Sequence, residues 1–491
     1  MSRLDLSSVD RLPGAIARPA YRVGDVGIGI VHLGIGAFHR AHQAMYTDDA
    51  LALAGGGWGI CGVSLRSPDV RDRMVPQDGL YTAIEKSPDG IRRRVVGSVR
   101  EVLFHGDEGE QVLRRLRSPD TRIVSLTVTE KGYCHAPATG RLDVDHPDIV
   151  HDLQTQNAPR SVVGLLVAAF AERRRTHGTP VTVVCCDNLT QNGALVCGLV
   201  VSFANLRDPS LADWIGREIA FPSTMVDRIV PATTGDDITG NNRALGVEDV
   251  APVVHEPFIQ WVIEDRFAAG RPAWDAAGAT LVHDVDPYEA MKLRLLNASH
   301  SALAYLGFLA GYEFIYEVAT QPDFIAFMRR YTADEVSPSL VTPAGVDLGA
   351  YREALVRRFA NPALPHRTQQ IAMDGSQKLP PRILATVRDN LAADRSVELA
   401  SLAVAGWMRY VYGEDEQGRR IEVSDPLAAS FASIAAAHRG DPTGFAQGLF
   451  ALRAIFDEDL HNEPRFTTPV IRRLTELFAL GAAKTVARAV S

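Results

Sequence analysis

The 491-residue sequence has no hydrophobic run of the length that a membrane-spanning helix requires. Its longest apolar stretches lie near residues 162–170 and 193–204, and both are shorter than the ~18 residues of a spanning segment. The N-terminal residues also lack an apolar stretch behind a basic start, so the sequence gives no indication of a secretory signal. Together these absences predict a cytoplasmic protein.

Cysteine is scarce, with five residues in the chain. They are odd in number and form neither a CxxC pair nor a ladder of cysteine and histidine ligands, which argues against structural zinc and for a reducing compartment. Cys185 and Cys186 lie in the apolar run VTVVCC, where free cysteine packs as a small hydrophobic residue. We therefore expect buried thiols and no metal site.

The sequence also lacks any long tract of one charge sign. Lysine and arginine total 51 against 59 acidic residues, for a formal net charge of -8, and the two signs are interspersed. No basic stripe is present to neutralise a run of phosphates, so nucleic acid is a poor candidate partner. With 46% hydrophobic residues, the composition is typical of a folded enzyme. The length predicts two or three domains.

Short runs rich in β-branched residues alternate with helical patterns in the first half of the chain. The runs are GIVHLGIG, WGICGVSL, RIVSLTVTE and TPVTVVCCDN, and residues 162–175 have the pattern of a crossover helix. This alternation predicts an α/β fold with a parallel sheet covered by helices on both faces. After about residue 285 the spacing is helical. We predict an α/β domain over residues 1–285 and a mostly helical domain over 286–491, with the site in a cleft between them.

A glycine-rich segment, IGIVHLGIGAFHRAH over residues 28–42, connects the first predicted strand to a helix. Two glycines at such a turn let the backbone approach a diphosphate, which the helix N-terminus also attracts. His39 replaces the third glycine of the usual GxGxxG pattern, so the motif by itself also fits an ordinary loop. The cofactor-binding candidates in this segment are Gly34, Gly36, Ala37 and Phe38.

The next predicted strand, GICGVSL, ends near Arg66 and Asp69, where the ribose of a dinucleotide lies in folds of this type. An acidic side chain there accepts a hydrogen bond from the 2'-hydroxyl and repels a 2'-phosphate, so Asp69 predicts NAD. NADP is the alternative, because Arg66 could bind its 2'-phosphate. The spacing of 35 residues from Gly34 to Asp69 is also longer than the usual ~20 residues.

The segment MKLRLLNASHS, residues 291–301, supplies the main catalytic candidates Lys292, Asn297 and His300. At ~100° per residue these three fall within an arc of about 140° on an α-helix, so all can reach one pocket. A desolvated lysine has a lowered pKa and can take a hydroxyl proton, and an asparagine can donate to a developing alkoxide. His300 would orient the lysine or the substrate. The alternative is an exposed lysine beside a satisfied core histidine.

Polar residues follow the VTVVCC strand in the string DNLTQNG. Because the carboxyl end of a parallel strand faces the ligand crevice, Asn188 is a candidate second amide donor. Asp187 and Asn192 fit the capping of a turn or helix equally well.

A third polar cluster is HRTQQIAMDGSQKLP, which contains His366, Arg367, Asp374 and Lys378. Arg367 and Lys378 suit a substrate carboxylate or several hydroxyls. The alternative is surface ion pairing.

With these residues identified, the chain resembles the polyol-specific long-chain dehydrogenases, the family of mannitol 2-dehydrogenase and fructuronate reductase. The resemblance covers nearly the whole length and rests on long strings. These are HLGIGAFHRAHQAMYTD, ICGVSLRSPD, QDGLYT, IVSLTVTEKGYC, CCDNLTQNG, FPSTMVDRIVP, EPFIQWVIED and KLRLLNASHSALAYLG. It implies an expanded Rossmann-type N-terminal domain, a mostly helical C-terminal domain and no metal.

The resemblance also implies roles for single residues. Lys292 corresponds to the general base of alcohol oxidation, and Asn188 and Asn297 to the oxyanion hole. Glu289, one turn before Lys292, corresponds to a glutamate implicated in proton passage. The remaining implied positions are His300 and Lys378 as substrate contacts, Asp227 as a further substrate-binding residue, and Asp69 as the NAD-selecting aspartate.

The string HRTQQIAMDGSQKLP is similar to the fructuronate reductases, and Arg367 would then bind the carboxylate of a hexuronate. We therefore expect interconversion of D-fructuronate and D-mannonate, with D-mannitol and D-fructose as the alternative pair. Two alternatives to a polyol or hexuronate dehydrogenase are a catalytically silent NAD-binding sensor and a decarboxylating hydroxyacid dehydrogenase. The expected partner is a small polyol, ketose or hexuronate, and the sequence leaves the oligomeric state open.

Overall fold

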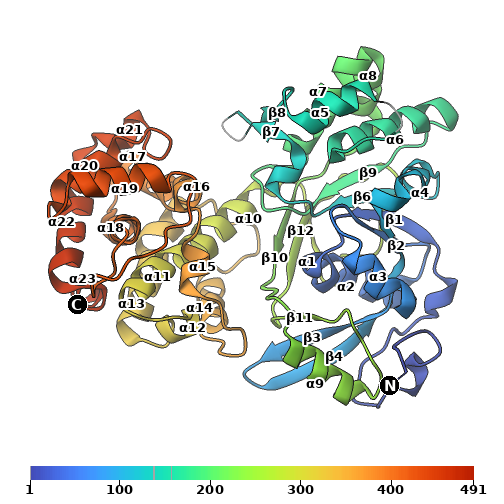
Figure 1. Ribbon diagram of the computed structural model, residues 1–491, viewed down its shortest axis with the longest axis horizontal. Helices are drawn as coiled ribbons and strands as arrows, with labels where there is room; N and C mark the ends of the chain where they lie inside the picture. Colours follow the sequence, from blue (N-terminus) through green and yellow to red (C-terminus); the bar gives the residue numbers. More distant parts are fainter. Residues whose placement is uncertain (1, 137–138, 156–157) are drawn as a thin grey trace. The chain divides into compact units, whose positions relative to one another are not determined.

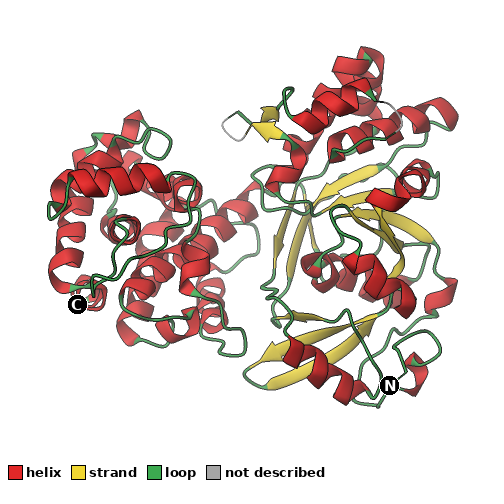
Figure 2. Cartoon of the chain, viewed as in Figure 1, coloured by secondary structure: helices red, strands yellow, loops and turns green. Residues whose placement is uncertain are grey.

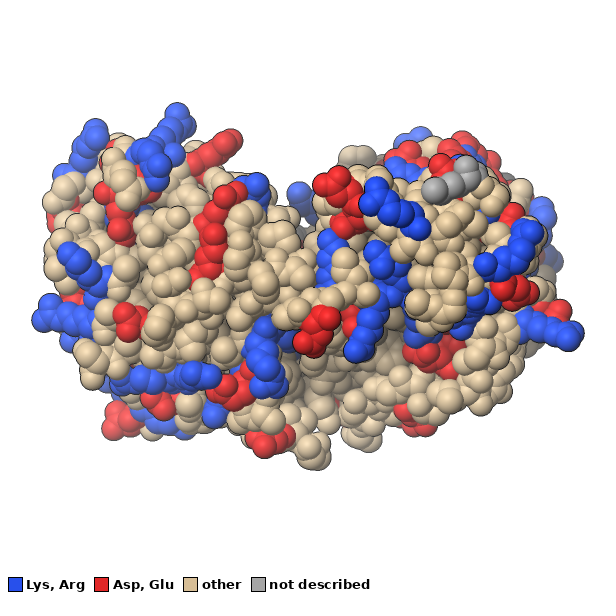
Figure 3. Space-filling model, turned by 90° about the horizontal axis from the view of Figure 1, so that it is seen from below, with Lys and Arg blue, Asp and Glu red and all other residues tan. Residues whose placement is uncertain are grey.

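The computed structural model describes residues 2–136, 139–155 and 158–491, and the chain divides into two compact units (Figure 1). Unit 1 is Met1–Asp286 and unit 2 is Pro287–Ser491. Among the described residues, no helix is both long and apolar enough to cross a membrane. Basic and acidic side chains are interspersed over the face seen in Figure 3, in agreement with the mixed charge pattern of the sequence.

Unit 1 is built on a five-stranded parallel sheet with the strand order β5-β2-β1-β6-β9. The strands are β1 (Ile28–Leu33), β2 (Gly59–Ser64), β5 (Val99–Phe104), β6 (Ile123–Leu126) and β9 (Thr182–Cys185). Nearly all their residues are buried, as expected where helices cover both faces of a parallel sheet. The strand order reverses between β1 and β6, which is the arrangement of doubly wound folds. This confirms the predicted Rossmann-type α/β fold.

Two hydrophobic cores lie on the two faces of this sheet, because successive side chains of a strand alternate between faces. Val31 and Leu33 belong to one core and Ile30 to the other. Cys185 packs in the same core as Val31, and Cys186 packs in the same core as Ile30. Both cysteines are buried, as predicted. The helices of unit 1 are α1 (Ala37–Ala41), α2 (Gln43–Ala54), α3 (Asp69–Met74), α4 (His105–Arg117), α5 (Pro147–Gln154), α6 (Val162–Thr176), α7 (Asn192–Arg207), α8 (Pro209–Glu218) and α9 (Gly235–Leu245).

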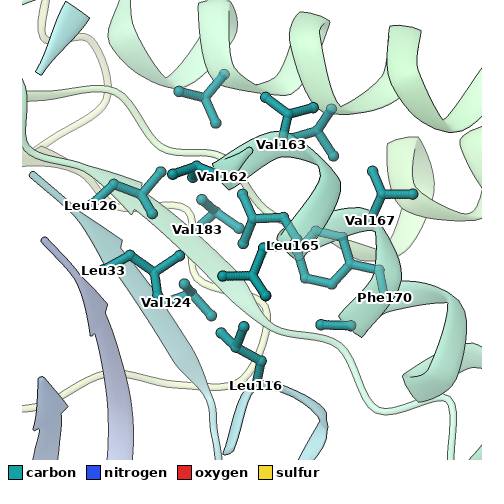
Figure 4. Close-up of a cluster of buried hydrophobic side chains, with 14 of the residues drawn as sticks. Leu33, Leu116, Val124, Leu126, Val162, Val163, Leu165, Val167, Phe170 and Val183 are labelled. Atoms are coloured by element: carbon teal, nitrogen blue, oxygen red, sulfur yellow. The ribbon is translucent and has the colours of Figure 1, made fainter. Parts of the chain in front are cut away.

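Helix α6 is the crossover helix predicted over residues 162–175, and its apolar side chains pack on β1, β6 and β9 (Figure 4). It begins where Ser161 accepts the amide hydrogen of Gly164 at 2.9 Å, a typical N-cap. In its last turn the fully buried Arg173 donates to five backbone carbonyls, including those of Leu116 and Ser118. Arg173 therefore fixes the end of this helix against the loops beside the sheet.

Smaller sheets extend unit 1 beyond the parallel sheet. One has the order β11-β3-β4, a second has the order β10-β12-β13, and β7 pairs with β8. The strands are β3 (Tyr81–Ser87), β4 (Gly90–Val96), β7 (His135–Ala136), β8 (Arg141–Leu142), β10 (Thr224–Asp227), β11 (Val253–His255), β12 (Gln260–Glu264) and β13 (Thr280–Val282). Several pair in antiparallel fashion, which distinguishes them from the strands of the main sheet.

Unit 2 is helical, and apart from two isolated bridges its described residues form no strand (Figure 2). At its centre lies α18 (Glu398–Val411), in which every residue from 399 to 411 is buried, so neighbouring helices surround it. The other helices are α10 (Asp286–Met291), α11 (Ala298–Leu309), α12 (Ile315–Val318), α13 (Pro322–Arg330), α14 (Leu348–Phe359), α15 (Thr368–Ala372), α16 (Gly375–Leu379), α17 (Ala385–Ala392), α19 (Ala428–Ala437), α20 (Pro442–Phe450), α21 (Glu458–His461), α22 (Pro464–Leu480) and α23 (Ala482–Val490). Three π-helical segments, η5 (Lys292–Asn297), η6 (Tyr331–Val336) and η8 (Pro380–Leu384), connect some of them.

Candidate functional site

The first set of predicted residues lies at the carboxyl edge of the parallel sheet in unit 1. Gly34 follows β1 with a φ of 99°, and a Cβ atom at this position would overlap the carbonyl oxygen of Thr127. Glycine is therefore required there, both for the backbone angle and for the close approach of two strands. At Gly36 a Cβ would meet only the Gly34 carbonyl, at 3.8 Å, so the turn is open on that side. Ala37 and Phe38, both partly exposed, begin α1.

His39 occupies the position of the missing third glycine and is buried. Its ring stacks on that of His32, with 3.4 Å between centroids and 14° between planes. The His32 ring in turn lies 2.8 Å from Ser125 Oγ and 2.9 Å from Thr127 Oγ1, on the neighbouring strand and its loop. Burial lowers the pKa of His32 to about 3 and holds that of His39 well below its usual value, so both rings are neutral. The third glycine of the usual pattern allows the helix to pack closely on the sheet. Here the stacked histidine pair connects the first helix to the sheet instead.

The helix after the glycine turn is interrupted at His42, which has non-helical backbone angles between α1 and α2. His42 Nε2 lies 2.8 Å from the carbonyl oxygen of Gln260 in β12. The ring of Phe38 stacks on His42, with 5.1 Å between centroids. These contacts turn the Phe38 side chain toward the core rather than toward solvent.

Arg66 and Asp69 lie beyond the end of β2 and are both exposed. Asp69 is the first residue of α3, and its amide donates to Ser67 Oγ at 3.2 Å. Within the described part of the chain neither side chain forms an ion pair, whereas Arg71 in the same helix pairs with Asp72 at 2.8 Å. The acidic and basic candidates for cofactor choice are therefore both accessible.

A partly buried aspartate organises the loops after β6 and β9. The Asp187 carboxylate accepts hydrogen bonds from the amides of Val128 and Thr129, at 2.9 and 3.1 Å, and from the Tyr133 hydroxyl at 2.6 Å. Thr129 has a φ of 66°, which is unusual for a β-branched residue. Burial raises the pKa of Asp187 although these three donors oppose the shift. Asn188, the predicted amide donor, follows directly and is exposed.

Asn192 connects this loop to the second sheet. Its amide group donates to the carbonyls of Asp187 and Thr224, at 3.0 and 2.9 Å, and accepts from the Thr224 amide at 2.9 Å. Thr224 begins β10, and Asp227 ends it with only 5% of its surface exposed. Asn192 is thus a structural cross-link that positions the strand containing Asp227.

Three potential metal donors, Cys134, His146 and Asp148, lie with their ligand atoms within 4.8 Å of one another. His146 Nδ1 accepts the amide hydrogen of Asp148 at 3.2 Å and thereby caps α5. Burial, together with nearby aspartates, raises the pKa of the Cys134 thiol to about 11. The thiol is therefore protonated at neutral pH, and we assign this group to the cap of α5.

The second set of predicted residues lies in unit 2, where Lys292 is only 7% exposed. The turn from Lys292 to Asn297 is π-helical, whereas the sequence pattern predicted a regular α-helix. In a π-turn the residues i and i+5 are hydrogen-bonded neighbours, so Lys292 and Asn297 lie one turn apart on the same face of the helix. In a regular α-helix they would be separated by about 140° around the helix axis. Arg382 contributes to this geometry, because its guanidinium donates to the carbonyl of Asn297 at 3.3 Å and to Ser301 Oγ at 2.9 Å. Such π-turns occur frequently at functional sites.

His300 lies one turn further along, near the start of α11. Its ring stacks on Phe359 with 4.9 Å between centroids, and the His366 ring lies 5.2 Å away. Burial holds the pKa of His300 well below its usual value, and the cations around it, including Lys378 and Arg382, lower it further. The imidazole is therefore neutral and has one donor and one acceptor nitrogen.

Lys378 lies in α16, on a rigidly held turn. Ser376 donates to the Asp425 carboxylate through its amide at 2.8 Å and its hydroxyl at 2.6 Å. Gly375 packs directly on the indole of Trp407, where a Cβ would overlap the ring nitrogen. The Lys378 ammonium donates to the carbonyls of residues 371 and 373 at 3.2 and 2.5 Å. Burial, and then the charge of Arg382, lowers the pKa of Lys378 to about 8.

Arg367 is not part of this cationic group. Its guanidinium pairs with the Glu313 carboxylate and lies 5.4 Å from the centre of the Phe314 ring, and its side chain is 62% exposed. Glu289 lies in α10, three residues before Lys292, and is partly buried. In unit 2 the unpredicted Arg382 therefore links Asn297 with His300 and Lys378, and Lys292 lies one π-turn before Asn297. Arg367 lies in a surface ion pair instead.

Residues 28–276 match the family described as the mannitol dehydrogenase Rossmann domain, and residues 284–478 match the mannitol dehydrogenase C-terminal domain. The D-mannonate oxidoreductase of Escherichia coli K12 is 45% identical over 96% of this chain and 98% of its own length. The mannitol 2-dehydrogenase of Pyricularia oryzae is 40% identical over 97% and 96% of the two chains. The Pseudomonas fluorescens mannitol 2-dehydrogenase, solved as a ternary complex with NAD and D-mannitol, superposes with a TM-score of 0.87 at 40% identity, over 99% of each chain.

Proposed function

Because the chain belongs to the mannitol dehydrogenase family, we propose that it is an NAD-dependent oxidoreductase acting on the CH–OH groups of hexose-derived substrates. The observation that supports this most directly is the buried Lys292, which a π-turn aligns with Asn297. A lysine kept from water and next to an amide donor is suited to move a proton at a carbon-bound oxygen.

We assign the cofactor to the carboxyl edge of the parallel sheet. The turn at Gly34 lies where the strand order reverses, the usual place for a dinucleotide in such sheets. Gly36, Ala37 and Phe38 would line the diphosphate. Asp69 would accept from the ribose hydroxyl and favour NAD, while Arg66 leaves NADP as an alternative. When bound, NAD supplies the hydride acceptor for alcohol oxidation.

The residues of the chain would handle the proton and the developing charge. Lys292 takes the hydroxyl proton as the C–O bond becomes a carbonyl, and it returns that proton when the ketone is reduced. Asn188 and Asn297 donate hydrogen bonds to the substrate oxygen, which costs no burial of charge. Glu289, one turn before the lysine, would pass the proton to solvent.

We propose D-fructuronate and D-mannonate as the substrate pair. A hexuronate carries a carboxylate, and the cations of unit 2 provide partners for it: Lys378 beside the reacting groups, and Arg367 after release from Glu313. Asp227 and His300 would bind substrate hydroxyls. The E. coli D-mannonate oxidoreductase supports this choice. D-mannitol and D-fructose are the second candidate pair, supported by the mannitol 2-dehydrogenases of P. oryzae and P. fluorescens.

The test compares NADH oxidation with fructuronate, tagaturonate and fructose at equal concentrations. We expect kcat/KM for fructuronate to exceed that for fructose by at least tenfold, and oxidation of mannonate to release no carbon dioxide. A preference for fructose would instead identify a mannitol 2-dehydrogenase, and carbon dioxide release a decarboxylating enzyme. Binding of NADH without reduction of any substrate, with NADPH equally inactive, would support the silent sensor. We place the reaction in the cytoplasm, in keeping with the five free cysteines.

A further inference from the structure

A cavity of about 670 Å³ lies at the edge of the parallel sheet where the strands begin. We call it the amino-edge pocket. Its lining includes Ile28 at the start of β1, Gly57 before β2, Arg100 in β5 and Arg122 directly before β6. Because the strands are parallel, this edge is the one opposite the Gly34 turn. A strand of six residues spans about 20 Å, so the pocket is separate from the proposed cofactor site.

The pocket is strongly basic. Arg100, Arg115 and Arg122 line it, and among the described lining residues Asp120 is the only acidic one. Arg115 is paired with Glu101, at 2.6 and 3.2 Å. On the other side of Arg115 a smaller cavity of about 280 Å³ adds the exposed Arg114. The net charge of the chain is negative, so this concentration of guanidinium groups is local.

Two of these arginines have no carboxylate partner within the described residues. The Arg122 guanidinium lies 3.4 Å from the centre of the Trp58 ring and donates to the Gly57 carbonyl at 2.7 Å. Arg100 donates to the Asp78 carbonyl at 3.3 Å, and its buried Nε has no hydrogen-bond partner. Burial lowers the pKa of both guanidinium groups. Asp78 near Arg100 and Asp120 near Arg122 offset part of this burial cost without forming an ion pair, and a bound anion would offset more of it.

We propose that the amino-edge pocket binds a small ligand through a doubly charged phosphoryl group. The planar guanidinium forks of Arg100 and Arg122 match the oxygens of such a group, and the volume is within the range of small-molecule sites. One face of the Trp58 ring is covered by Arg122, so that face offers no stacking surface for a nucleotide base. The ligand class is therefore a phosphorylated sugar or inorganic phosphate, which share the same recognised group.

The experiment titrates the full-length protein with inorganic phosphate and with glucose 6-phosphate by calorimetry, at low ionic strength. Saturating NADH keeps both probes out of the cofactor site. We expect one ligand per chain, with Kd increased at least tenfold by Arg100→Gln and by Arg122→Gln. Arg217→Gln is the matched control, because this exposed arginine in the last turn of α8 is far from the pocket in sequence and does not line it. If glucose 6-phosphate binds more tightly than phosphate, the natural ligand is a phosphorylated sugar. If the two probes bind equally, the natural ligand is inorganic phosphate.

Loss of folding is separated from loss of binding by thermal melts and by NADH affinity. Arg100→Gln is the milder change, since the Arg100 guanidinium donates to a single carbonyl, and Arg122→Lys keeps the charge but not the planar fork. If phosphate raises the melting temperature of the parent protein and of a folded Arg100→Gln variant equally, the proposal is wrong. It is also wrong if neither probe binds the parent protein.

Discussion

The Tyr133 hydroxyl donates to the Asp187 carboxylate across 2.6 Å, on the same carboxylate that accepts the amides of Val128 and Thr129. Asp187 thereby fixes the loop after β6 to the end of β9. The residue that follows it is Asn188, to which we assign a hydrogen bond to the reacting oxygen. A structural contact thus lies one residue from a proposed catalytic group.

Tyr133→Phe removes one of the three donors to Asp187 and leaves a partly buried carboxylate oxygen with one hydrogen bond fewer. We expect the free energy of unfolding to fall by about 1–3 kcal/mol, measured by urea denaturation, and kcat to fall by more than the affinity for NADH. The matched control is Tyr410→Phe, because the Tyr410 hydroxyl is buried without a partner among the described residues and its removal has little cost. Equal losses of stability in the two variants would contradict the role of this hydrogen bond.

Lys292→Ala removes the proposed proton acceptor. Turnover should fall by about 10²–10⁴-fold, the usual contribution of general acid–base catalysis, while NADH affinity measured by fluorescence stays nearly constant. Lys484→Ala is the control, since Lys484 is exposed in α23. If turnover and NADH affinity fell together, Lys292 would have to be a structural residue.

Asp69→Ala removes the carboxylate proposed to bind the ribose and to repel a 2'-phosphate. The ratio of kcat/KM for NAD to that for NADP should drop by about tenfold, in line with the loss of one charge-assisted hydrogen bond of about 1.5 kcal/mol. Asp89→Ala, in the exposed turn after β3, serves for comparison. An unchanged ratio would assign cofactor choice to another residue.

Lys378 predicts a pH dependence. Its pKa of about 8, lowered mainly by burial, means that its positive charge is lost as the pH rises through 8. The KM for mannonate should therefore rise above pH 8, whereas the KM for a neutral ketose changes less. Because the folded-state pKa is below the usual value of 10.5, burial of the charged amine costs stability below pH 8, and this cost disappears between pH 8 and 10.5. Lys378→Arg should remove the rise of KM above pH 8. If the Lys378→Arg variant still showed this rise, Lys378 would not be its cause.

Arg367→Ala tests the second carboxylate partner. If Arg367 exchanges Glu313 for a hexuronate, the variant should raise the KM for fructuronate at least tenfold and leave that for fructose within about twofold. Arg329→Ala removes a comparable surface pair, with Glu353 at 2.8 Å, and should change neither constant. Similar losses for both substrates would limit Arg367 to its ion pair with Glu313.

The parallel sheet and its crossover helix were predictable because their signals are local. β1, β2, β6 and β9 are largely apolar runs buried on both faces, and α6 begins at a serine cap one residue before its apolar pattern. The edge strand β5 contains Arg100 and Glu101, is only partly buried and was not predicted. The smaller sheets were not predicted. Strands such as β11 and β13 have three residues each, too few to show a periodicity, and form only through pairing with distant segments.

The residue types of the site were also predictable, but their arrangement was not. Lys292, Asn297 and His300 were identified from spacing, yet the carbonyl at the end of the π-turn is held by an arginine 85 residues away in the sequence. The Tyr133–Asp187 hydrogen bond joins residues 54 positions apart, and although Asp187 was a capping candidate, no local pattern pairs it with Tyr133. Long-range contacts of this kind leave no periodicity in the chain.

The widened turn between Lys292 and Asn297 sets the rotational phase between α10 and α11. Deleting one residue inside it would convert the turn to ordinary α-helical geometry, in which Lys292 and Asn297 stay one turn apart, at a spacing of four residues instead of five. Such a deletion would therefore preserve the face on which Glu289, Lys292 and His300 lie and change only the width of the turn between them. The π-turn thus accommodates one more residue than an α-helical turn does, without altering which side chains share a face.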